Sequence, residues 1–432
     1  MIIGIDIGTT SVCAVLLDKS TKRILKTLNT KNPSHLSGKK DFERLQDPDV
    51  ILDTVVSLAD TLFSYAGEDK ISSIGISSQM HGILYTDKDM NALSPLYTWQ
   101  DARGSEIISD GVSYAEYASE ITGGAEKSGY GIVTAFFNKR NSLVPDGAKY
   151  IMTIGDFVAS RLANTSSPVM HVSMAASIGA FSLRALDFDR EAIKKLSIDP
   201  ALLPRVTKSA ECIGKYRSAS VFVSLGDNQA SFLGAAGDNS LLVNIGTGSQ
   251  ISFVTDASAL DRLSDSSPYE LRPYIDGKYL SVGAALCGGY SYAILASFFK
   301  KTAELLGKPD ADIYSFMESC ISKSDLSSDI TVDTSFMGTR SDPARRGSIS
   351  DISPSNFTPS DLIIGFNYGI ANELYRLYLD MDDGKERILT CSGNGIKKNQ
   401  ALMKIVEKTF GMPLTLSPAE EDAALGAALF TV

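Results

Sequence analysis

The sequence predicts an α/β protein in which one domain architecture occurs twice, and three observations lead to this prediction. Apolar strands alternate with helix-like stripes and run into polar, glycine-rich turns, which is typical of α/β folds. Residues 2–17 and 241–254 share a pattern of apolar strand, Gly-Thr-rich turn and second strand. At 432 residues the chain is long enough for two domains. We expect the two domains at residues 1–233 and 234–432, with the boundary near 230–240. Two unrelated hairpins would also explain the pattern that residues 2–17 and 241–254 share.

Helices and strands are expected at defined places along the chain. A helix should begin after Asp47, with Pro48 at its first position, and end at Gly67. The capping-box pattern of residues 417–420 predicts that a last helix begins there and continues to Phe430. Strands that end in polar turns are expected at residues 71–76, 221–225 and 388–391.

Composition excludes several classes of protein. Lys and Arg number 41 against 51 Asp and Glu, a net charge of −10, and such an acidic balance argues against a broad nucleic-acid surface. No apolar run approaches the roughly 18–20 residues of a membrane helix, and no basic signal segment opens the chain. The five cysteines lack a CxxC pair. We therefore expect a protein of the reducing cytoplasm, without a disulfide framework or zinc site.

Two glycine-rich turns are candidate phosphate-binding elements. Residues 6–11 read Asp-Ile-Gly-Thr-Thr-Ser, and residues 245–250 read Ile-Gly-Thr-Gly-Ser-Gln. Glycine lets the backbone approach a ligand, and the N–H and hydroxyl groups that follow can face phosphate oxygens. Their equivalent places in the two halves suggest a nucleotide whose phosphates lie between two lobes, and Asp6 could hold a metal through water. A tight hairpin turn without a ligand would have the same sequence.

Asp227 is the candidate catalytic base. It follows an apolar strand and precedes a helix, so its carboxylate should be partly desolvated and oriented by N–H groups. An aspartate at this place could equally be a helix N-cap.

A second group of residues suits a polyol. His81 lies in a polar turn after a strand, and residues 99–103 place an indole, an amide, a carboxylate and a guanidinium together. Sugars offer C–H faces to an aromatic ring and hydroxyls to charged groups. The alternatives are a structural histidine, and a core tryptophan next to a surface Asp–Arg pair.

Together these motifs resemble the FGGY family of carbohydrate kinases, which belongs to the actin-like ATPases. The matches span almost the whole chain: residues 6–10, 79–82, 99–101, 226–228, 246–248, 288–289 and 393–399. The resemblance implies two actin-like (ribonuclease-H-like) α/β domains with a cleft between them. It implies an ATP-dependent kinase that acts on the primary hydroxyl of a small-molecule sugar with magnesium, and no nucleic-acid or membrane partner. A homodimer is kept as an option for its assembly.

The roles of the family's residues carry over to matching positions. Asp227 resembles the base, and Asp6 with Asp227 resembles the magnesium-organising pair. The expected phosphate contacts are Gly8, Thr9, Thr10, Gly246, Thr247 and Gly248. The expected adenosine-side contacts are Gly288, Gly289, Gly395 and Asn399. The expected sugar-side residues are Gln79, Met80, His81, Trp99, Asp101 and Asn228.

Within the family the chain is most similar to the sedoheptulokinases, then to the xylulokinases. Gln229 favours the former, because xylulokinases usually place alanine there. Departures from the family pattern are residues 155–157 (Gly-Asp-Phe), Ala102 and Asn394. We therefore expect a ketose kinase for sedoheptulose, with xylulose or another ketose or polyol as alternatives. A non-kinase actin-like ATPase and a sugar-sensing protein are the rivals from other classes.

Overall fold

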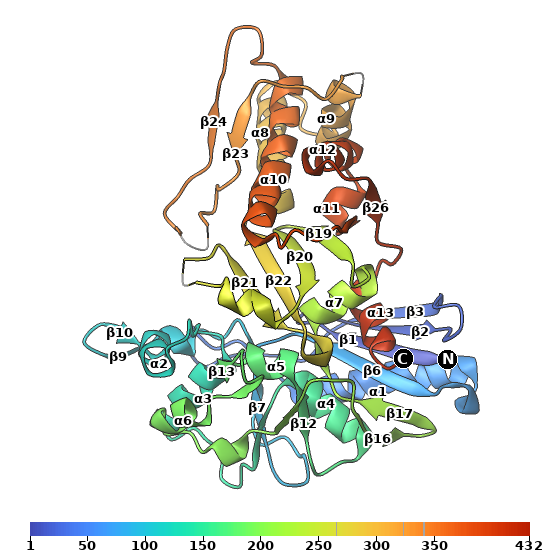
Figure 1. The fold of residues 1–432 in the computed structure, drawn as a ribbon, viewed down its shortest axis with the longest axis vertical. Coiled ribbons are helices and arrows are strands. Elements are labelled where there is room, and N and C mark those ends of the chain that lie inside the picture. The colour runs from blue at the N-terminus through green and yellow to red at the C-terminus, as the bar shows by residue number, and fades with distance from the viewer. Residues whose placement is uncertain (265, 323, 340–341) are drawn as a thin grey trace. The chain divides into compact units, whose positions relative to one another are not determined.

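Two mixed sheets with helices packed on them organise the computed structural model (Figure 1). The structure describes residues 1–264, 266–322, 324–339 and 342–432. Its contacts define two units. Unit 1 comprises Met1–Gly234, Arg272–Tyr279 and Ala419–Val432, and unit 2 comprises Ala235–Leu271 and Leu280–Pro418. The expected division after residue 233 and the expected cleft stay predictions.

The sheet of unit 1 has the strand order β16-β17-β6-β1-β2-β3, and β18 also pairs with β6. The strands are β1 Ile2–Ile7, β2 Ser11–Leu17, β3 Ile24–Lys31, β6 Ser73–Ser78, β16 Cys212–Tyr216, β17 Ala219–Phe222 and β18 Leu225–Gly226. β1 pairs antiparallel with β2 and parallel with β6, and β18 is parallel to β6. The carboxyl ends of β1, β6 and β18 therefore meet at one edge, which is where α/β folds place their ligands.

The sheet of unit 2 has the order β21-β22-β20-β19-β25-β26. Its strands are β19 Ser240–Ile245, β20 Ser249–Thr255, β21 Tyr269–Pro273, β22 Tyr279–Ala285, β25 Ile388–Ser392 and β26 Leu414–Leu416. β19 pairs antiparallel with β20 and parallel with β25. This is the arrangement that β1 has with β2 and β6, so the echo in the sequence corresponds to a repeated sheet pattern.

Helices cover both sheets. They are α1 Pro48–Ala66, α2 Tyr114–Thr122, α3 Gly131–Arg140, α4 Ile154–Ala163, α5 Val172–Ser177, α6 Arg190–Lys195, α7 Asp227–Ala235, α8 Gly288–Leu305, α9 Ile313–Ile321, α10 Pro359–Met381, α11 Asn394–Lys397, α12 Gln400–Phe410 and α13 Asp422–Leu429. Short strands complete the chain: β4 His35–Leu36, β5 Leu45–Gln46, β7 Leu84–Thr86, β8 Leu96–Tyr97, β9 Ile107–Ser109, β10 Val112–Ser113, β11 Tyr150–Met152, β12 Val169–His171, β13 Phe181–Ser182, β14 Asp187–Phe188, β15 Arg205–Thr207, β23 Thr331–Asp333 and β24 Ser348–Ser350.

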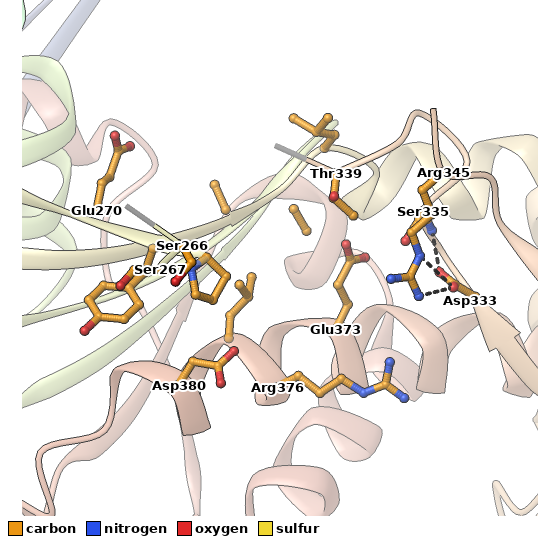
Figure 2. A pocket seen from close by; sticks show the side chains of 16 residues that line it. Ser266, Ser267, Glu270, Asp333, Ser335, Thr339, Arg345, Glu373, Arg376 and Asp380 are labelled. Carbon is orange, nitrogen blue, oxygen red and sulfur yellow. Dashed lines mark hydrogen bonds and ion pairs between the residues drawn. The ribbon is translucent and has the colours of Figure 1, made fainter. Parts of the chain in front are cut away.

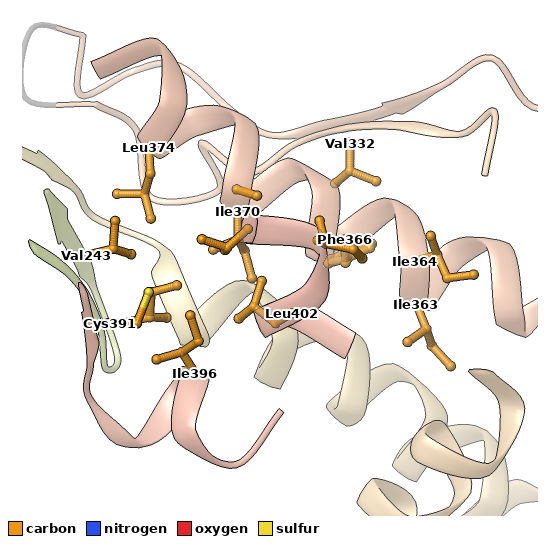
Figure 3. Close-up of a cluster of buried hydrophobic side chains, with 14 of the residues drawn as sticks. Val243, Val332, Ile363, Ile364, Phe366, Ile370, Leu374, Cys391, Ile396 and Leu402 are labelled. Atoms are coloured by element: carbon orange, nitrogen blue, oxygen red, sulfur yellow. The ribbon is translucent and has the colours of Figure 1, made fainter. Parts of the chain in front are cut away.

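The core of unit 2 forms where α10 crosses the sheet (Figure 3). One stripe of this helix, which includes Phe366, Ile370 and Leu374, packs against Val243 of β19 and Cys391 of β25. All five side chains are at most 3% exposed. Burial of such apolar area, at about 25 cal/mol per Å², is the main stabilisation of the unit.

The first predicted helix is confirmed and the last one is wrong at its start. The Asp47 side chain accepts hydrogen bonds from the first turn of α1, with Pro48 at N1 and Gly67 at the C-cap. The final helix begins at Asp422, so residues 417–420 form no capping box. Ser417 instead extends the pairing of β26, since its N–H donates to the Cys391 carbonyl at 2.8 Å. This distant pairing partner overrides the local capping signal.

The α13 helix packs on β1 and β6 of unit 1, at the other end of the sequence (Figure 1). Glycines allow this approach, because a Cβ on Gly4 or Gly75 would overlap the carbonyl oxygen of Ala424 or Ala427. Unit 1 is therefore completed by the last residues of the chain.

Candidate active site

The edge of the unit 1 sheet collects several predicted site residues. Asp6 lies near the end of β1, Gln79 follows β6, and Asp227 follows β18 as the first residue of α7. The predicted strand 221–225 is interrupted, because β17 ends at Phe222 and β18 begins at Leu225. Asp227 thus starts the helix instead of preceding it as an N-cap.

Asp6 and Asp227 are close enough for their charges to interact. The pKa of Asp227 is raised to about 7, first by burial and then by the Asp6 charge, while the Asn228 backbone N–H and Arg272 oppose the shift. Burial also raises the pKa of Asp6, against a 2.7 Å hydrogen bond that the Ser77 hydroxyl donates to its Oδ1. A carboxyl whose pKa is near neutrality is suited to general base catalysis.

The turn Gly8–Thr10 presents backbone donors. The Gly8 N–H donates to the Ser11 carbonyl at 2.9 Å and closes the hairpin. Within the described residues, no hydrogen bond uses the N–H groups of Thr9 and Thr10. Side-chain amides hold the turn from behind: Asn32 Nδ2 donates to the Gly8 carbonyl at 2.9 Å, and Gln46 Nε2 donates to the Thr9 carbonyl at 2.8 Å. Two adjacent N–H groups are a suitable donor set for an anion.

The side chain of Thr9 already has two partners. Its Oγ1 donates to Gln79 Oε1 at 2.9 Å and accepts from Trp99 Nε1 at 3.0 Å. Any phosphate contact from Thr9 would therefore use its backbone N–H. Gln79 is only 5% exposed, and its contact with a sugar stays a prediction.

His81 has a left-handed backbone, with φ of 73°. Its N–H donates to Ser177 Oγ at 3.1 Å, and Nδ1 lies 2.7 Å from the Ser177 carbonyl, which can only accept, so Nδ1 carries the proton. The ring stacks on Tyr130, the residue before α3, at 4.8 Å and 3°. A left-handed backbone at a residue other than glycine costs about 1–3 kcal/mol, and residues with such strain are typical of functional sites. Sequence analysis missed Tyr130, because only the fold brings it to His81.

The alternative of a core tryptophan next to a surface Asp–Arg pair does not hold in the structure. Trp99 is 46% exposed, whereas Asp101 and Arg103 are each 1% exposed. Arg103 holds both carboxylate oxygens of Asp101, at 2.7 and 3.1 Å, and the Arg44 N–H donates to it at 3.1 Å. Asp101 therefore anchors the Trp99 segment, and its direct contact with a sugar stays a prediction. Arg103 was recognisable as a neighbour in sequence, but its burial was not.

Met80 and Gln229 pack behind the edge. Met80 is 8% exposed and belongs to an apolar cluster with Tyr85 and Tyr97. Gln229 is fully buried, and its Nε2 donates to the Pro273 carbonyl at 3.0 Å. The predicted sugar contact of Met80 stays a prediction.

Buried polar groups support the chain just before Asp227. Ser224 Oγ donates to Asp156 Oδ1 at 2.6 Å. The Gly226 N–H donates to Ser173 Oγ at 3.0 Å, and His171 Nδ1 lies 2.8 Å from the same oxygen.

The departure at Gly155 has a steric reason. A Cβ on Gly155 would lie 2.5 Å from Ser78 Oγ and 2.9 Å from Ser224 Oγ. No larger residue fits between the end of β6 and the segment before β18 without displacing one of them.

Unit 2 has a glycine turn at the corresponding place between β19 and β20, closed by a different hydrogen bond. The Gly246 N–H donates to the Gly248 carbonyl at 2.9 Å, and among described residues no hydrogen bond uses the N–H groups of Thr247 and Gly248. The α8 helix begins against this turn. A Cβ on Gly288 would lie 2.6 Å from the Gly248 carbonyl carbon, and one on Gly289 would overlap the Gly246 carbonyl oxygen. The two glycines therefore allow the start of α8 to lie close to the turn.

A cavity of 360 Å³ in unit 2 has Asn399 in its wall. Tyr292 and Tyr314, whose rings stack at 6.4 Å, also line it. Asn399 Nδ2 donates to Asn367 Oδ1 at 3.1 Å, and its Oδ1 caps α12. Gly395 lies nearby in the fold, packed on Ile245 and Gly246 of the turn. Aromatic side chains in the wall of a cavity are suited to packing against a nucleobase.

A second cavity in unit 2, of 440 Å³, contains none of the predicted site residues (Figure 2). Arg345 forms an ion pair with Asp333 there, and Glu373, Arg376 and Asp380 project from α10. Burial raises the pKa of Glu373. The charged groups are of both signs and indicate no ligand class.

Among the described residues, neither a metal-binding cluster nor a membrane-spanning helix is present. No cluster of three or more His, Cys, Asp or Glu side chains is arranged to hold a metal. None of the described helices combines the length and apolarity needed to cross a bilayer.

Comparison with protein families matches the whole chain. The N-terminal domain model of the FGGY family of carbohydrate kinases matches residues 1–244, and the C-terminal domain model matches residues 241–432.

Individual relatives match over nearly their full length. Sedoheptulokinase from Mus musculus is 26% identical over 99% of this chain and 96% of the mouse protein. Xylulose kinase from Staphylococcus xylosus is 23% identical over 99% of this chain and 89% of its own. The crystal structure of gluconate kinase from Lactobacillus acidophilus superposes with a TM-score of 0.81 at 21% identity, over 100% of this chain and 88% of that one. At this identity the likeness shows a shared fold alone.

Proposed function

The chain belongs to the FGGY family of carbohydrate kinases and is an ATP-dependent sugar phosphotransferase, and we propose that its acceptor is a ketose, with sedoheptulose as the first candidate. The observation that carries this choice is the 26% identity to mouse sedoheptulokinase along 99% of the chain. Xylulose is the second candidate, supported by the full-length match to a xylulose kinase at 23% identity.

Asp227 is the proposed base. Its carboxylate would accept the proton of the sugar's primary hydroxyl while that oxygen attacks the γ-phosphorus of ATP and ADP leaves. With a pKa of about 7, a substantial fraction of the carboxyl is ionised at neutral pH. The carboxylate is also basic enough to accept the proton of the hydroxyl.

The nucleotide phosphates would be bound mainly by backbone donors. Each turn offers two N–H groups that the described residues do not use, at Thr9 and Thr10 in unit 1 and at Thr247 and Gly248 in unit 2. Backbone donors are rigid and positioned before the reaction, which is the main requirement of phosphoryl transfer. The tyrosine-lined cavity at Asn399 is the proposed place of the adenosine.

Magnesium fits the carboxylates present. Mg²⁺ is usually held by one or two carboxylates together with substrate phosphates, and Asp6 and Asp227 are two carboxylates whose charges interact. They would hold the ion, which would neutralise phosphate charge. Ser77 would keep Asp6 oriented through its 2.7 Å hydrogen bond.

The acceptor site is proposed to lie at Trp99 and His81. Trp99 exposes a ring face that can pack on the C–H groups of a sugar. His81 is held by Ser177 and Tyr130, so its ring is oriented before a ligand arrives. Asn228, next to Asp227 on α7, is the third proposed residue of the acceptor site.

A panel of acceptors tests the proposal. Sedoheptulose, xylulose, other ketoses, gluconate, glycerol and aldoses would be compared with ATP in an ADP-release assay, with a no-acceptor control. We expect the highest kcat/KM for sedoheptulose, with xylulose next. A highest kcat/KM for an aldose, glycerol or gluconate would contradict the ketose proposal. ATP hydrolysis unaffected by every acceptor would contradict the acceptor site itself.

A further inference from the structure

A closed ring of hydrogen bonds joins the turn after β1 to Gln46, a residue that sequence analysis did not identify. Thr9 Oγ1 donates to Gln79 Oε1 at 2.9 Å, and Gln79 Nε2 donates to Gln46 Oε1 at 2.8 Å. Gln46 Nε2 closes the ring by donating to the Thr9 carbonyl at 2.8 Å. Trp99 Nε1 donates into the ring at Thr9 Oγ1, at 3.0 Å.

Every hydrogen bond of the ring has a fixed direction. The indole N–H of Trp99 can only donate, so Thr9 Oγ1 accepts from it and gives its one hydrogen to Gln79. This orients the Gln79 amide, which in turn orients the Gln46 amide. A buried chain of this kind is cooperative, because the loss of one member leaves others unsatisfied.

Gln46 is also tied to Trp99 through the backbone. It lies in β5, the central strand of the sheet β4-β5-β8, and pairs with Leu96 of β8. The Thr98 N–H and hydroxyl both donate to the Arg44 carbonyl, at 3.0 and 2.8 Å. The strand that supports the Trp99 segment therefore carries the side chain that holds the Thr9 carbonyl.

Gln46 is not placed to contact a ligand itself. It is 3% exposed, and both polar atoms of its amide are used inside the ring. Any effect on catalysis must pass through Thr9, Gln79 and Trp99.

We propose that Gln46 is a positioning residue that couples acceptor binding at Trp99 to nucleotide binding at the turn Gly8–Thr10. The inference rests on the proposed function, which assigns those two elements to sugar and nucleotide. Both proposed sites are built on the same ring, so a ligand that strengthens the hydrogen bonds of the ring at one site also favours the binding geometry of the other. Coupling between two sites is reciprocal, and each ligand therefore tightens the other by the same factor.

Two substitutions and one control separate this role from a general loss of stability. Gln46→Met removes both hydrogen bonds at nearly unchanged size. Gln46→Glu keeps the acceptor for Gln79 but places a carboxylate against the Thr9 carbonyl. The control is Asn141→Met, which removes two amide hydrogen bonds, to Tyr114 and to the Phe137 carbonyl, away from the ring.

The first readout is the emission of Trp99, the single tryptophan of the chain. β,γ-Methylene-ATP with Mg²⁺, and no sugar, should change this emission in the parent and in Asn141→Met. In Gln46→Met and Gln46→Glu the change should fall by at least about half, because the Thr9 hydroxyl is no longer held.

The second readout is the coupling factor. Calorimetry gives the dissociation constant of β,γ-methylene-ATP with and without saturating sedoheptulose, or xylulose if sedoheptulose does not bind. We expect a ratio of about 5 or more in the parent and below about 3 in both Gln46 variants. KM for both substrates should rise about five- to tenfold, with kcat at saturation changed less than about threefold.

The outcomes are distinguishable. A Gln46 variant that folds, as judged by its melting curve, and retains the emission response and the coupling factor overturns the role of Gln46. Gln46→Glu carries the test if Gln46→Met does not fold. A parent that binds neither β,γ-methylene-ATP nor any sugar would instead contradict the proposed function.

Discussion

The Arg103 guanidinium holds both carboxylate oxygens of Asp101, at 2.7 and 3.1 Å, in a pair of which each member is 1% exposed. Arg103 also lies 4.1 Å from the centre of the Tyr97 ring and donates to Asn138 Oδ1 at 2.6 Å. Every charge in the pair thus has a partner, and the pair anchors the segment that carries Trp99.

Removing one member of this pair should be strongly destabilising. Arg103→Met leaves a buried carboxylate without its countercharge, and we expect a loss of about 3–5 kcal/mol in the free energy of unfolding. Urea denaturation measures this. The control Arg140→Met, at the exposed end of α3, should stay within about 0.5 kcal/mol of the parent. An Arg103→Met loss below about 1 kcal/mol would show that the pair is not structurally important.

Asp227→Asn tests the proposed base. The change keeps the shape of the side chain but removes the proton acceptor, and general base catalysis contributes about 10²–10⁴-fold. We expect kcat to fall at least about a hundredfold, with the affinity for nucleotide in the absence of Mg²⁺ little changed because the turns remain intact. Asp89→Asn, an exposed carboxylate paired with Lys88, is the control. A folded Asp227→Asn protein that retains more than about a tenth of the parental kcat would rule out the role.

Gly289→Ala should weaken nucleotide binding. Its new Cβ would overlap the Gly246 carbonyl oxygen, so the start of α8 or the turn must move. We expect the dissociation constant of ADP, measured by calorimetry, to rise by about tenfold or more, with sugar binding unaffected. Gly237→Ala, where a Cβ meets nothing within 4 Å, should leave ADP binding unchanged. Equal ADP affinity in the two variants would contradict the close approach.

Asp156 should make the protein less stable as pH rises from about 4 to about 6. Burial raises its pKa from 3.8 to about 6, although Ser224 and Thr153 donate to it. The folded state therefore binds the proton more tightly than the unfolded state, and this stability is lost through that window. Asp156→Asn keeps hydrogen-bond capacity without the titration, and relative to the parent it should gain about 1–3 kcal/mol between pH 4 and 7. A constant difference across this range would contradict the shift.

His171 should have the opposite effect. Burial lowers its pKa from 6.5 to about 4, against the Lys208 carbonyl and Asp276. The unfolded state then binds the extra proton, so the contribution is present above about pH 6.5 and is lost as pH falls toward 4. His171→Gln should lose less stability than the parent on acidification over this window. Parallel curves of unfolding free energy against pH for the two proteins would argue against a buried neutral imidazole.

Sequence was sufficient where the signal was local. The Asp47 cap of α1 and the two glycine turns depend on neighbours in the chain, and the sheet pattern around β1 and β19 follows from their echo. It was insufficient where a partner is distant. The β26 pairing of Ser417, the burial of Arg103 and the His81–Tyr130 stack each depend on residues far along the chain or on tertiary packing. The role of Gln46 could not be predicted from the sequence, because a glutamine in a short strand belongs to no recognisable motif.

The packing of α13 on β1 and β6 has a consequence for how the protein is made. A ribosome delivers Ile2–Ile7 first and Asp422–Leu429 near the end of the described chain, and domains usually fold in the order of synthesis. The β1 strand is synthesised before α13, and the face that Gly4 lines has no helix to cover it until almost all of unit 2 has been synthesised. We therefore expect this face of the sheet to stay uncovered until Asp422–Leu429 has been synthesised.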